Sequence, residues 1–548
     1  MNDSPKKAPA QFLFAPVDIA WLAILRVAFG LCAFADVVMN FADGRWFHSP
    51  MHFSYPGFEW ITAWPGFGMK IHLAVLGLLA LAVAAGFLYR LCAALFFAGY
   101  AFLFLCDASQ YRDDTYLICL LAALMAVLPA HRAASLDVRA GRVAPMDSVP
   151  AWMLWLLRFQ IAIVYVFSGI AHLNADWLAG LPVKFWLADC ANIHLIGPVL
   201  ARDWMVPVVV YGVIFFYLLI TPLLFWRPTR LIAFIVACGF HFTSALTFST
   251  AIFPCVMIVG TMVFFDPAWP RRTGWLGRKE NDTGGVHAAK AAPVLLLLVY
   301  AVLQIALPLR HWRFPGDVQW TDEGRNFSWS MNLRSKFATA VLYVTDPKEK
   351  TTRGIMLSDE LPPALSRYVA SRPLLFAQFA RHIADTEAAK AGGRPEVRAR
   401  VLCSLNGRMP RLLVDTNMDF AAMPRPQAPW ILSLTNAPVG GGSSSELDSI
   451  QADLRKVRQE MADIQNVIAV TGKQMEGLDR GLRESASGTD QQTAVRTALL
   501  NRKQTLGQRL QVMTQLYRDK EKARTVLLEN LQDCLMAGSE VVPVSQAD

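Results

Sequence analysis

Trp155–Trp177 (WLLRFQIAIVYVFSGIAHLNADW) is an apolar stretch that ends in a polar segment. A bilayer core about 30 Å thick requires roughly 20 apolar residues in a helix, so this stretch predicts a membrane-spanning helix. Arg158 lies near one end of it and His172 lies at the other. Ionisable side chains in membrane helices are costly and are retained where they pair, line a cavity or react. The stretch therefore indicates a helical membrane protein, and its ionisable side chains are candidate functional residues.

Apolar runs of similar length fill residues 1–311 of the 548-residue chain. The chain is 54% hydrophobic and only 17% charged, whereas soluble domains carry about 25% charge. Its formal charge of +9 is modest, and its basic residues cluster beside the apolar runs, which favours membrane orientation over nucleic-acid binding. We therefore predict a mainly α membrane protein with about nine transmembrane helices, near residues 18–40, 70–89, 91–107, 115–130, 151–172, 205–226, 229–247, 249–266 and 291–309.

Lys and Arg are more frequent in the loops that share a side with the N-terminus than in the opposite loops. Cytoplasmic loops carry this excess, so we expect a cytoplasmic N-terminus, which starts with a polar segment and no cleavable signal peptide. Nine crossings then place everything after Leu309 on the outer side. The Ala- and Arg-rich composition and the short loops favour a multi-pass protein of a bacterial inner membrane.

The composition changes after the bundle. Short alternating runs such as Ala338–Val344 and Val401–Leu405, with one helical stretch near Leu361–Ile383, predict a small β-rich domain. Heptad spacing from Leu447 to Leu482 predicts a coiled coil, which could fold back on a second helix or pair with another chain, so self-association and a coiled-coil partner stay open. We divide the chain into a transmembrane bundle (1–311), an extramembrane β-rich domain (312–436), a Gly/Ser linker (437–445), a coiled-coil helical hairpin (446–535) and a disordered tail (536–548).

The predicted topology brings several protonatable side chains to the outer face of the bundle. Each has a simpler interpretation: Asp114 fits a helix cap, and His172 and His241 fit histidines that are hydrogen-bonded inside the bundle. Metal-ligand spacings and the HExxH, GxSxG and Walker motifs are absent from the sequence, so no metal site is expected. The residues alone allow a membrane enzyme, a receptor or a transporter. The outer-face set is Asp114, His172, Asp176, His241, Arg310 and His311.

Several stretches across residues 18–434 match one known family in sequence order. They are Thr115–Leu117, Pro129–Asp137, Leu157–Tyr165, Gly169–Trp177, Phe240–Phe242 with Phe253, Phe265–Arg272, Leu307–Trp312, Phe327–Met331, and Asn406–Arg408 with Asp415. On these stretches the chain resembles the vitamin K-dependent gamma-glutamyl carboxylase family, including its bacterial relatives with a horizontally transferred transmembrane (HTTM) domain. The coiled-coil tail lies outside the resemblance.

The resemblance implies an enzyme, a carboxylase of the carbon–carbon lyase type coupled to quinol epoxidation. In this family a base deprotonates vitamin K hydroquinone, and oxygen converts it to an epoxide through a strongly basic alkoxide. The alkoxide removes a proton from the γ carbon of a peptide glutamate, and the carbanion adds carbon dioxide. The implied cofactor is reduced vitamin K or menaquinol, with O₂ and CO₂ as co-substrates. The implied partners are the lipid bilayer and a glutamate-containing peptide or protein, not nucleic acid.

The resemblance also suggests roles for individual residues. We assign catalytic roles to His172, Asp114 and His241, with His172 as the base. Two departures stand out, because the family's enzymes place a Lys where His172 stands, and its animal members place a His where Asp114 stands. A family-fold protein that binds quinone or lipid without carboxylation, and recruits a partner through its coiled coil, is the alternative. The candidate cofactor-binding residues are Tyr165, Trp177, Arg310 and His311.

Overall fold

The structure is a computed structural model that describes residues 12–189, 197–200, 202–248, 252–274, 291–348, 350–391, 393–423, 430–434, 444–484 and 490–537. The chain divides into two compact units, Met1–Arg408 with Leu413–Ala437, and Met409–Leu412 with Pro438–Asp548. The predicted linker (437–445) and tail (536–548) fall largely outside the described residues.

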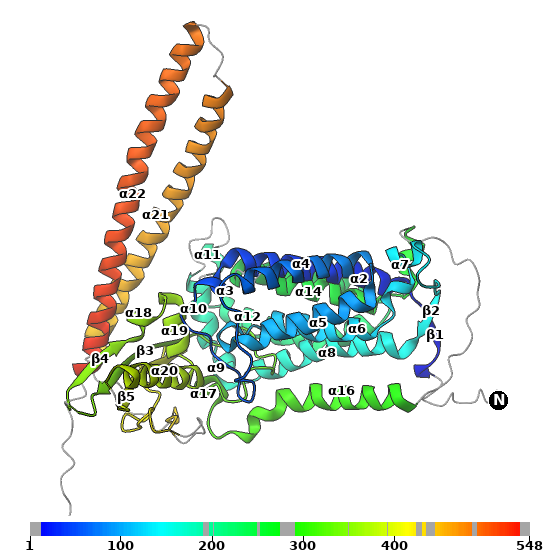
Figure 1. Cartoon of the computed structure of the whole chain (residues 1–548), viewed down its shortest axis with the longest axis horizontal. Helices are drawn as coiled ribbons and strands as arrows, with labels where there is room; N and C mark the ends of the chain where they lie inside the picture. Colours follow the sequence, from blue (N-terminus) through cyan, green and yellow to red (C-terminus); the bar gives the residue numbers. More distant parts are fainter. Residues whose placement is uncertain are drawn as a thin grey trace, which may run out of the picture. The chain divides into compact units, whose positions relative to one another are not determined.

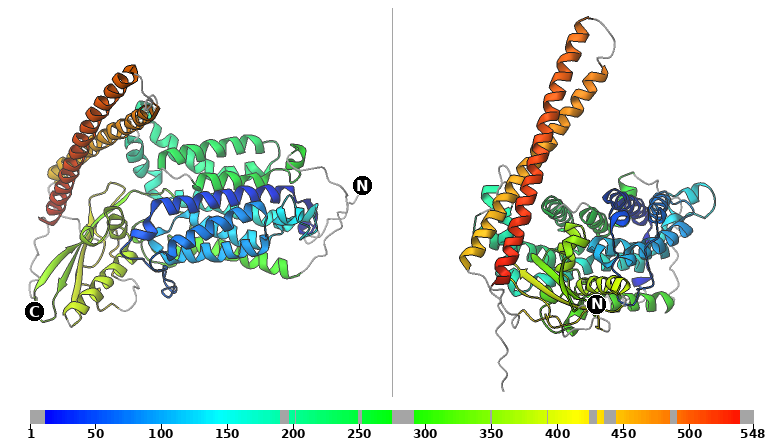
Figure 2. Two further views of the ribbon diagram at one scale, coloured as in Figure 1. Left: turned by 45° about the horizontal axis from the view of Figure 1, so that its top comes forward. Right: turned by 60° about the vertical axis from the view of Figure 1, so that its left-hand side comes forward.

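The first unit begins with a bundle of apolar helices that run side by side (Figures 1 and 2). A helix is present at each of the nine segments predicted from the sequence. Seven helices in the described part of the chain are long and apolar enough to cross a membrane, which supports an integral, multi-pass membrane protein. The nine are α2 (Ala20–Asp43), α4 (Gly68–Ala85), α5 (Tyr89–Cys106), α6 (Asp113–Val127), α8 (Ala151–His172), α12 (Met205–Phe225), α13 (Arg230–Phe248), α14 (Ile252–Thr261) and α16 (Ala291–Leu309).

Two of these helices are shorter than a membrane span. α6 has 15 residues and ends at Val127, because the following Leu128 precedes Pro129 and takes an extended conformation. α14 has 10 residues and continues as a 3-10 turn, η4 (Met262–Phe264). These two helices account for the difference between the nine predicted helices and the seven of membrane length.

Two arginines of the bundle, one buried and one half-buried, join its helices through backbone carbonyls. Arg26 of α2 donates to the carbonyls of Ala84, Ala130 and Ala133. Arg158 of α8 donates to the carbonyl of Val263, 2.9 Å from its Nε. Each guanidinium satisfies carbonyls that would otherwise lack donors in an apolar surrounding. Both arginines therefore connect helices of the bundle.

A small sheet follows the bundle within the same unit. Strand β3 (Lys336–Thr345) pairs antiparallel with β4 (Thr352–Met356) on one side and β5 (Glu396–Leu405) on the other. The predicted single helix near residues 361–383 is divided into α19 (Pro363–Ala370) and α20 (Pro373–Ala391), because Pro373 disfavours helical geometry in Arg372 before it. The predicted β-rich domain is thus a mixed α/β structure.

Short elements complete the first unit and connect the longer ones. β1 and β2 pair with each other near the start of the bundle, antiparallel. The short elements are β1 (Pro16–Asp18), α3 (Arg45–His48), η1 (Ala108–Gln110), η2 (Ala130–Arg132), α7 (Leu136–Arg139), β2 (Ser148–Pro150), α9 (Ala175–Leu178), α10 (Leu181–Asp189), α11 (Gly197–Leu200), α15 (Trp269–Arg272), η5 (Arg310–Arg313), α17 (Val318–Thr321) and α18 (Leu357–Glu360). The short strand β6 (Arg411–Leu412) belongs to the second unit.

The second unit is a hairpin of two long helices, α21 (Ser444–Glu484) and α22 (Asp490–Ala537) (Figure 1). Asp479 of α21 forms an ion pair with Lys503 of α22. Gln465 Nε2 of α21 donates a hydrogen bond to the Tyr517 hydroxyl of α22 at 3.2 Å. Residues early in one helix therefore meet residues late in the other, so the helices are antiparallel. This arrangement corresponds to the hairpin alternative of the sequence analysis.

Candidate functional site

His172 is the last residue of α8 and is buried. Its Nδ1 lies 2.6 Å from the carbonyl oxygen of Ser168, one turn earlier in the helix. A carbonyl can only accept, so Nδ1 carries the hydrogen in the neutral ring and Nε2 keeps the lone pair. The ring packs edge-on against Trp177, with centroids 4.2 Å apart, and lies 5.1 Å from Tyr217. His172 is thus an oriented proton acceptor with aromatic neighbours.

A second histidine joins the same aromatic surroundings. The Tyr165 hydroxyl of α8 lies 2.8 Å from Nε2 of His241 in α13. Tyr217 of α12 connects the two histidines, because its ring lies 6.4 Å from that of Tyr165. Four residues predicted from the sequence therefore lie in one group. We call it the aromatic cluster: Tyr165, His172, Trp177, Phe216, Tyr217, Phe240 and His241.

A segment of unusual backbone, Asp322–Asn332, lies against α8 and is called the strap below. Asp322, Phe327, Trp329 and Asn332 all have positive φ, between 48° and 64°. Such conformations are unfavourable for non-glycine residues and cluster at functional sites. Trp329 is fully buried, and its carbonyl accepts a hydrogen bond from Ser168 Oγ at 3.2 Å. The strap therefore joins the extramembrane domain to the residue that orients His172.

Arg310 and His311 contact the strap. Arg310 Nη2 donates to the Asn326 carbonyl at 2.6 Å, and its guanidinium lies 5.1 Å from the centre of the Phe327 ring. Gly324 approaches His311 so closely that a Cβ there would lie 2.6 Å from the His311 Cα. The contacts of these two residues position the strap, and their role in cofactor binding stays a prediction.

Asp114 belongs to a separate group of polar side chains. Its Oδ1 accepts from Arg112 Nε at 2.9 Å, and Arg112 Nη2 lies 3.0 Å from Asp36 Oδ1. Asp36 also accepts from the Tyr100 hydroxyl at 2.6 Å. These contacts link α2, α5 and α6, and they do not include His172. The neighbouring Asp113 instead accepts from the Tyr111 hydroxyl at 3.0 Å.

Asp176 connects the end of α8 to the extramembrane domain. It forms an ion pair with Arg408 and accepts from Asn406 Nδ2 at 2.7 Å. The hydrogen bond from Arg408 lowers the pKa of Asp176 below its ordinary value. Gly407 between these two residues packs against Phe185, where a side chain would collide. The Asn406–Arg408 motif thus holds the sheet beside α9.

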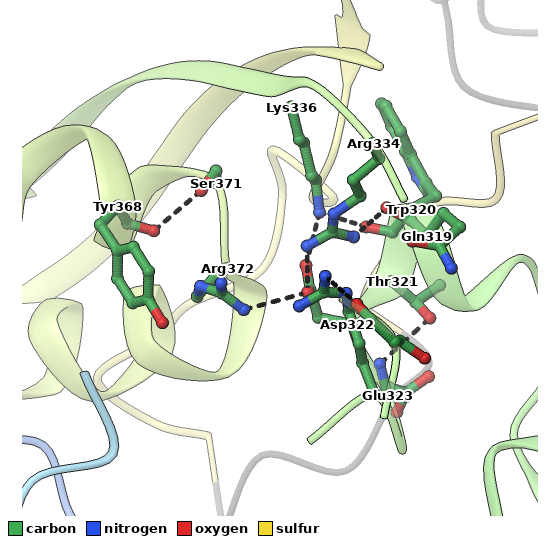
Figure 3. A network of polar contacts seen from close by, with 12 residues as sticks. Gln319, Trp320, Thr321, Asp322, Glu323, Arg334, Lys336, Tyr368, Ser371 and Arg372 are labelled. Atoms are coloured by element: carbon green, nitrogen blue, oxygen red, sulfur yellow. Dashed lines mark hydrogen bonds and ion pairs between the residues drawn. The ribbon is translucent and has the colours of Figure 1, made fainter. Parts of the chain in front are cut away.

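A buried ionic group in the extramembrane domain was not predicted from the sequence (Figure 3). Asp322 lies at its centre and pairs with Arg334, with Lys336 at 2.7 Å and with Arg372 at 3.3 Å. Arg325 acts on the Asp322 carboxylate electrostatically. The sequence signal for it was the pair of basic residues Arg334 and Lys336, two positions apart at the start of β3. We call Asp322, Arg325, Arg334, Lys336 and Arg372 the cationic cluster.

Comparison with known protein families covers both parts of the first unit. The HTTM domain matches residues 14–269. The lumenal domain of the vitamin K-dependent gamma-carboxylase matches residues 289–437. No solved structure matches the chain. The first match covers most of the helix bundle, and the second covers the strap, the sheet and the cationic cluster.

The two matches occur in the order that the resemblance predicted, and the second begins before α16. The family implies reduced vitamin K as cofactor, a lipid environment and a glutamate-containing substrate. The aromatic cluster lies within the first match and the strap lies within the second. The hydrogen bond from Ser168 to the Trp329 carbonyl joins the two matched regions. The chain belongs to the vitamin K-dependent gamma-carboxylase family.

Proposed function

We propose that the protein is a membrane-bound gamma-glutamyl carboxylase that uses reduced vitamin K or menaquinol, with O₂ and CO₂ as co-substrates. The orientation of His172 carries this proposal. Its Nδ1–H is held by the Ser168 carbonyl, so Nε2 is available to accept a proton inside an aromatic surrounding. Reduced vitamin K, when bound, supplies together with oxygen the strong base that removes the γ proton of glutamate.

The residues around His172 fit a quinol. A quinol has a planar apolar ring with two oxygens that form hydrogen bonds, and the aromatic cluster offers Trp177 and Tyr217 as flat neighbours. Trp329 Nε1 is a buried donor that lacks a hydrogen-bond partner among the described residues. Buried donors without partners are rare, and a bound oxygen atom would satisfy them. Trp329 lies next to Ser168 of α8, whose hydroxyl donates to the Trp329 carbonyl.

The side chains would act by orientation and by exclusion of water. Ser168 fixes the tautomer of His172, and Trp177 and Tyr217 cover its ring. Imidazole is a weaker base than the amine that stands at this position in the family's enzymes, so we expect a slower proton transfer than with Lys. Tyr165 and His241 complete the same buried region, where each satisfies the other's polar atom.

The experiment is a carboxylation assay on purified protein in nanodiscs, with reduced menaquinone or vitamin K, labelled bicarbonate and a glutamyl peptide. We expect label in the peptide and an equal amount of quinone epoxide. His172→Ala should abolish both products. His72→Ala is the matched control, because His72 also lies in a membrane helix and also bonds a backbone carbonyl, that of Gly99 at 2.9 Å. Equal activity in wild type and His172→Ala would refute the proposal.

A second candidate is a protein of the same fold that binds quinone or lipid without carboxylation and recruits a partner through its α21–α22 hairpin. Two observations favour it: His172 replaces the family's Lys, and the hairpin exposes Val470, Val512 and Leu516. Such a protein would bind quinone and form no epoxide in the assay above. We further propose a bacterial inner membrane, a cytoplasmic N-terminus and an outer extramembrane domain, supported by the distribution of Lys and Arg.

A further inference from the structure

The cationic cluster holds more positive than negative charge. Its carboxylate is Asp322, and the field of Arg325 and Arg372 also reaches the carboxylate of Asp113 at the start of α6. Four basic side chains therefore face two carboxylates. The basic members are Arg325, Arg334, Lys336 and Arg372.

The excess charge falls on Arg325 and Arg372. Arg334 and Lys336 each pair with Asp322 and each donate to a backbone carbonyl, so their positive charges are well compensated. Arg372 makes a longer contact with Asp322, at 3.3 Å, and its guanidinium lies 4.1 Å from the centre of the Tyr368 ring. The hydrogen bond found for Arg325 is to the Ser330 carbonyl, at 2.8 Å from Nη2. An added anion would compensate the positive charge of these two guanidinium groups.

Both of these arginines also keep a buried donor without a partner. Arg325 Nε and Arg372 Nε are enclosed and make no hydrogen bond to any described residue. Arginine presents its donors in a planar fork that matches a carboxylate, often with two parallel hydrogen bonds. Buried charges are normally both paired and hydrogen-bonded. Two such forks with unused donors therefore point to a ligand with a negative charge and planar oxygens.

The electrostatics of Arg325 agree with this geometry. Burial would lower the pKa of Arg372, but Tyr368, Asp322 and Asp113 raise it above its ordinary value. Burial, followed by repulsion from Arg334 and Arg372, lowers the pKa of Arg325 to about 10. An anion bound between Arg325 and Arg372 would remove that repulsion. Arg372 retains 19% of its side-chain exposure, whereas Lys336 retains 3%, so the cluster is reached from solvent at Arg372.

The strap connects these arginines to the candidate base. Arg325 binds the Ser330 carbonyl, and the carbonyl of the adjacent Trp329 binds Ser168, which orients His172. Three successive contacts thus lead from the excess positive charge to the aromatic cluster within one compact unit. A ligand held by Arg325 would lie at the strap, on the side of the extramembrane domain.

We propose that Arg325 and Arg372 bind a carboxylate that the enzyme uses, and that its source is the glutamate-containing substrate. The choice of source rests on the proposed function, since a carboxylase must hold its glutamate while the γ proton is removed. Bicarbonate offers the same planar, negatively charged oxygens and is the competing source. Arg334 and Lys336 would keep Asp322 neutralised, so the two other arginines remain free for the ligand.

The test measures peptide binding by the full chain in nanodiscs, without quinone and without oxygen, by fluorescence anisotropy of a labelled glutamyl peptide. Arg372→Gln should weaken binding about tenfold or more, because a charge-assisted contact is lost. Arg325→Lys keeps the charge but loses the fork, and should weaken binding too. The control is Arg381→Gln on α20, an arginine that bonds a single carbonyl, that of Met423, at 2.9 Å. Hydrogen exchange of β3 and β5 verifies that each variant is folded.

The source is identified with a peptide in which glutamine replaces glutamate. If the peptide carboxylate is the ligand, the glutamine peptide binds wild type as weakly as the glutamyl peptide binds Arg372→Gln. If bicarbonate is the ligand, the two peptides bind wild type with equal affinity. Bicarbonate then slows hydrogen exchange in the cationic cluster of wild type but not in that of Arg372→Gln. This outcome overturns the peptide assignment. Wild-type affinity in both folded arginine variants, with no bicarbonate effect, overturns the site altogether.

Arginine-dependent peptide binding without carboxylation would support the site and refute the proposed function. Carboxylation with an unchanged peptide KM in both variants would support the proposed function and refute the site.

Discussion

Replacing Asp322 with asparagine removes the negative charge at the centre of the cationic cluster and little else. Asp322 has φ of 63°, a conformation that asparagine also adopts readily, so Asp322→Asn leaves the backbone unstrained. The amide keeps a carbonyl oxygen as acceptor but no longer compensates Arg334, Lys336 and Arg372. The substitution thus tests charge pairing separately from chain geometry.

The expected loss of stability is large. The side chains of Asp322 and Lys336 keep only 8% and 3% exposure, so solvent cannot replace the missing charge. Removing one partner from a buried ion pair costs about 3–5 kcal/mol. Burial alone would raise the pKa of Asp322, but Arg334, Lys336, Arg372 and Arg325 hold it well below its ordinary value. The carboxylate is therefore charged in the folded protein throughout the neutral range, and its contribution falls only in strong acid, below about pH 4.

Hydrogen exchange of the β3 and β5 amides measures this loss in the intact membrane protein, because exchange reports local opening free energy. A cost of 3 kcal/mol corresponds to roughly a hundredfold faster exchange. Asp385→Asn is the control, since Asp385 pairs with Arg394 at 3.6 Å on the surface, with side chains 65% and 57% exposed. We expect less than about 1 kcal/mol from that exposed pair. If Asp322→Asn accelerates exchange no more than Asp385→Asn does, the cluster does not stabilise the domain as argued.

Three further predictions concern the site and the hairpin. Trp329→Phe removes a buried N–H without a partner, so quinone affinity should fall by about tenfold, and the smaller ring should lower the melting temperature because it leaves a cavity; unchanged affinity would exclude this donor from quinone binding. Because the pKa of Asp176 lies below its ordinary value, its pairing with Arg408 contributes stability above about pH 4 that is lost in stronger acid. The melting temperatures of wild type and Asp176→Asn should therefore differ by a constant amount from pH 7 to 5 and converge below pH 4, and a difference that persists there would contradict the assignment. Deleting residues 446–548 should leave membrane insertion and quinone binding intact but change oligomer size or partner capture, and failure to insert would show that the domain boundary is wrong.

The helices were predictable because each depends on a local property, an apolar run of membrane length. α8 is the clearest case, since its run ends at His172, where the helix ends. Helix length was predicted less well at α14, because a run of apolar residues does not reveal that its last turn becomes a 3-10 helix. The β3 and β5 strands were recognised from alternation, whereas the break between α19 and α20 was missed although Pro373 signals it.

The candidate site was predictable only where its residues are close in sequence. His172 and Trp177 stand five positions apart and meet across a single turn. The pair of Tyr165 with His241 requires the packing of α8 against the α12–α13 pair, which the sequence does not specify. The cationic cluster is harder still, because it joins the strap, the first residue of β3 and the junction between two helices. No periodic pattern marks a charged residue whose partner lies on another element, so this cluster emerged only from the structure.

The central claim, that His172 is the base for the quinol, is tested most directly by quinone epoxide formation in His172→Ala and His172→Lys. Lysine stands at this position in the family's enzymes, and its amine can take the same proton. The account predicts glutamate-dependent epoxide from wild type, none from His172→Ala, and as much or more from His172→Lys. Epoxide formed by His172→Ala at the wild-type rate, in protein whose His72→Ala control is also active, would contradict it.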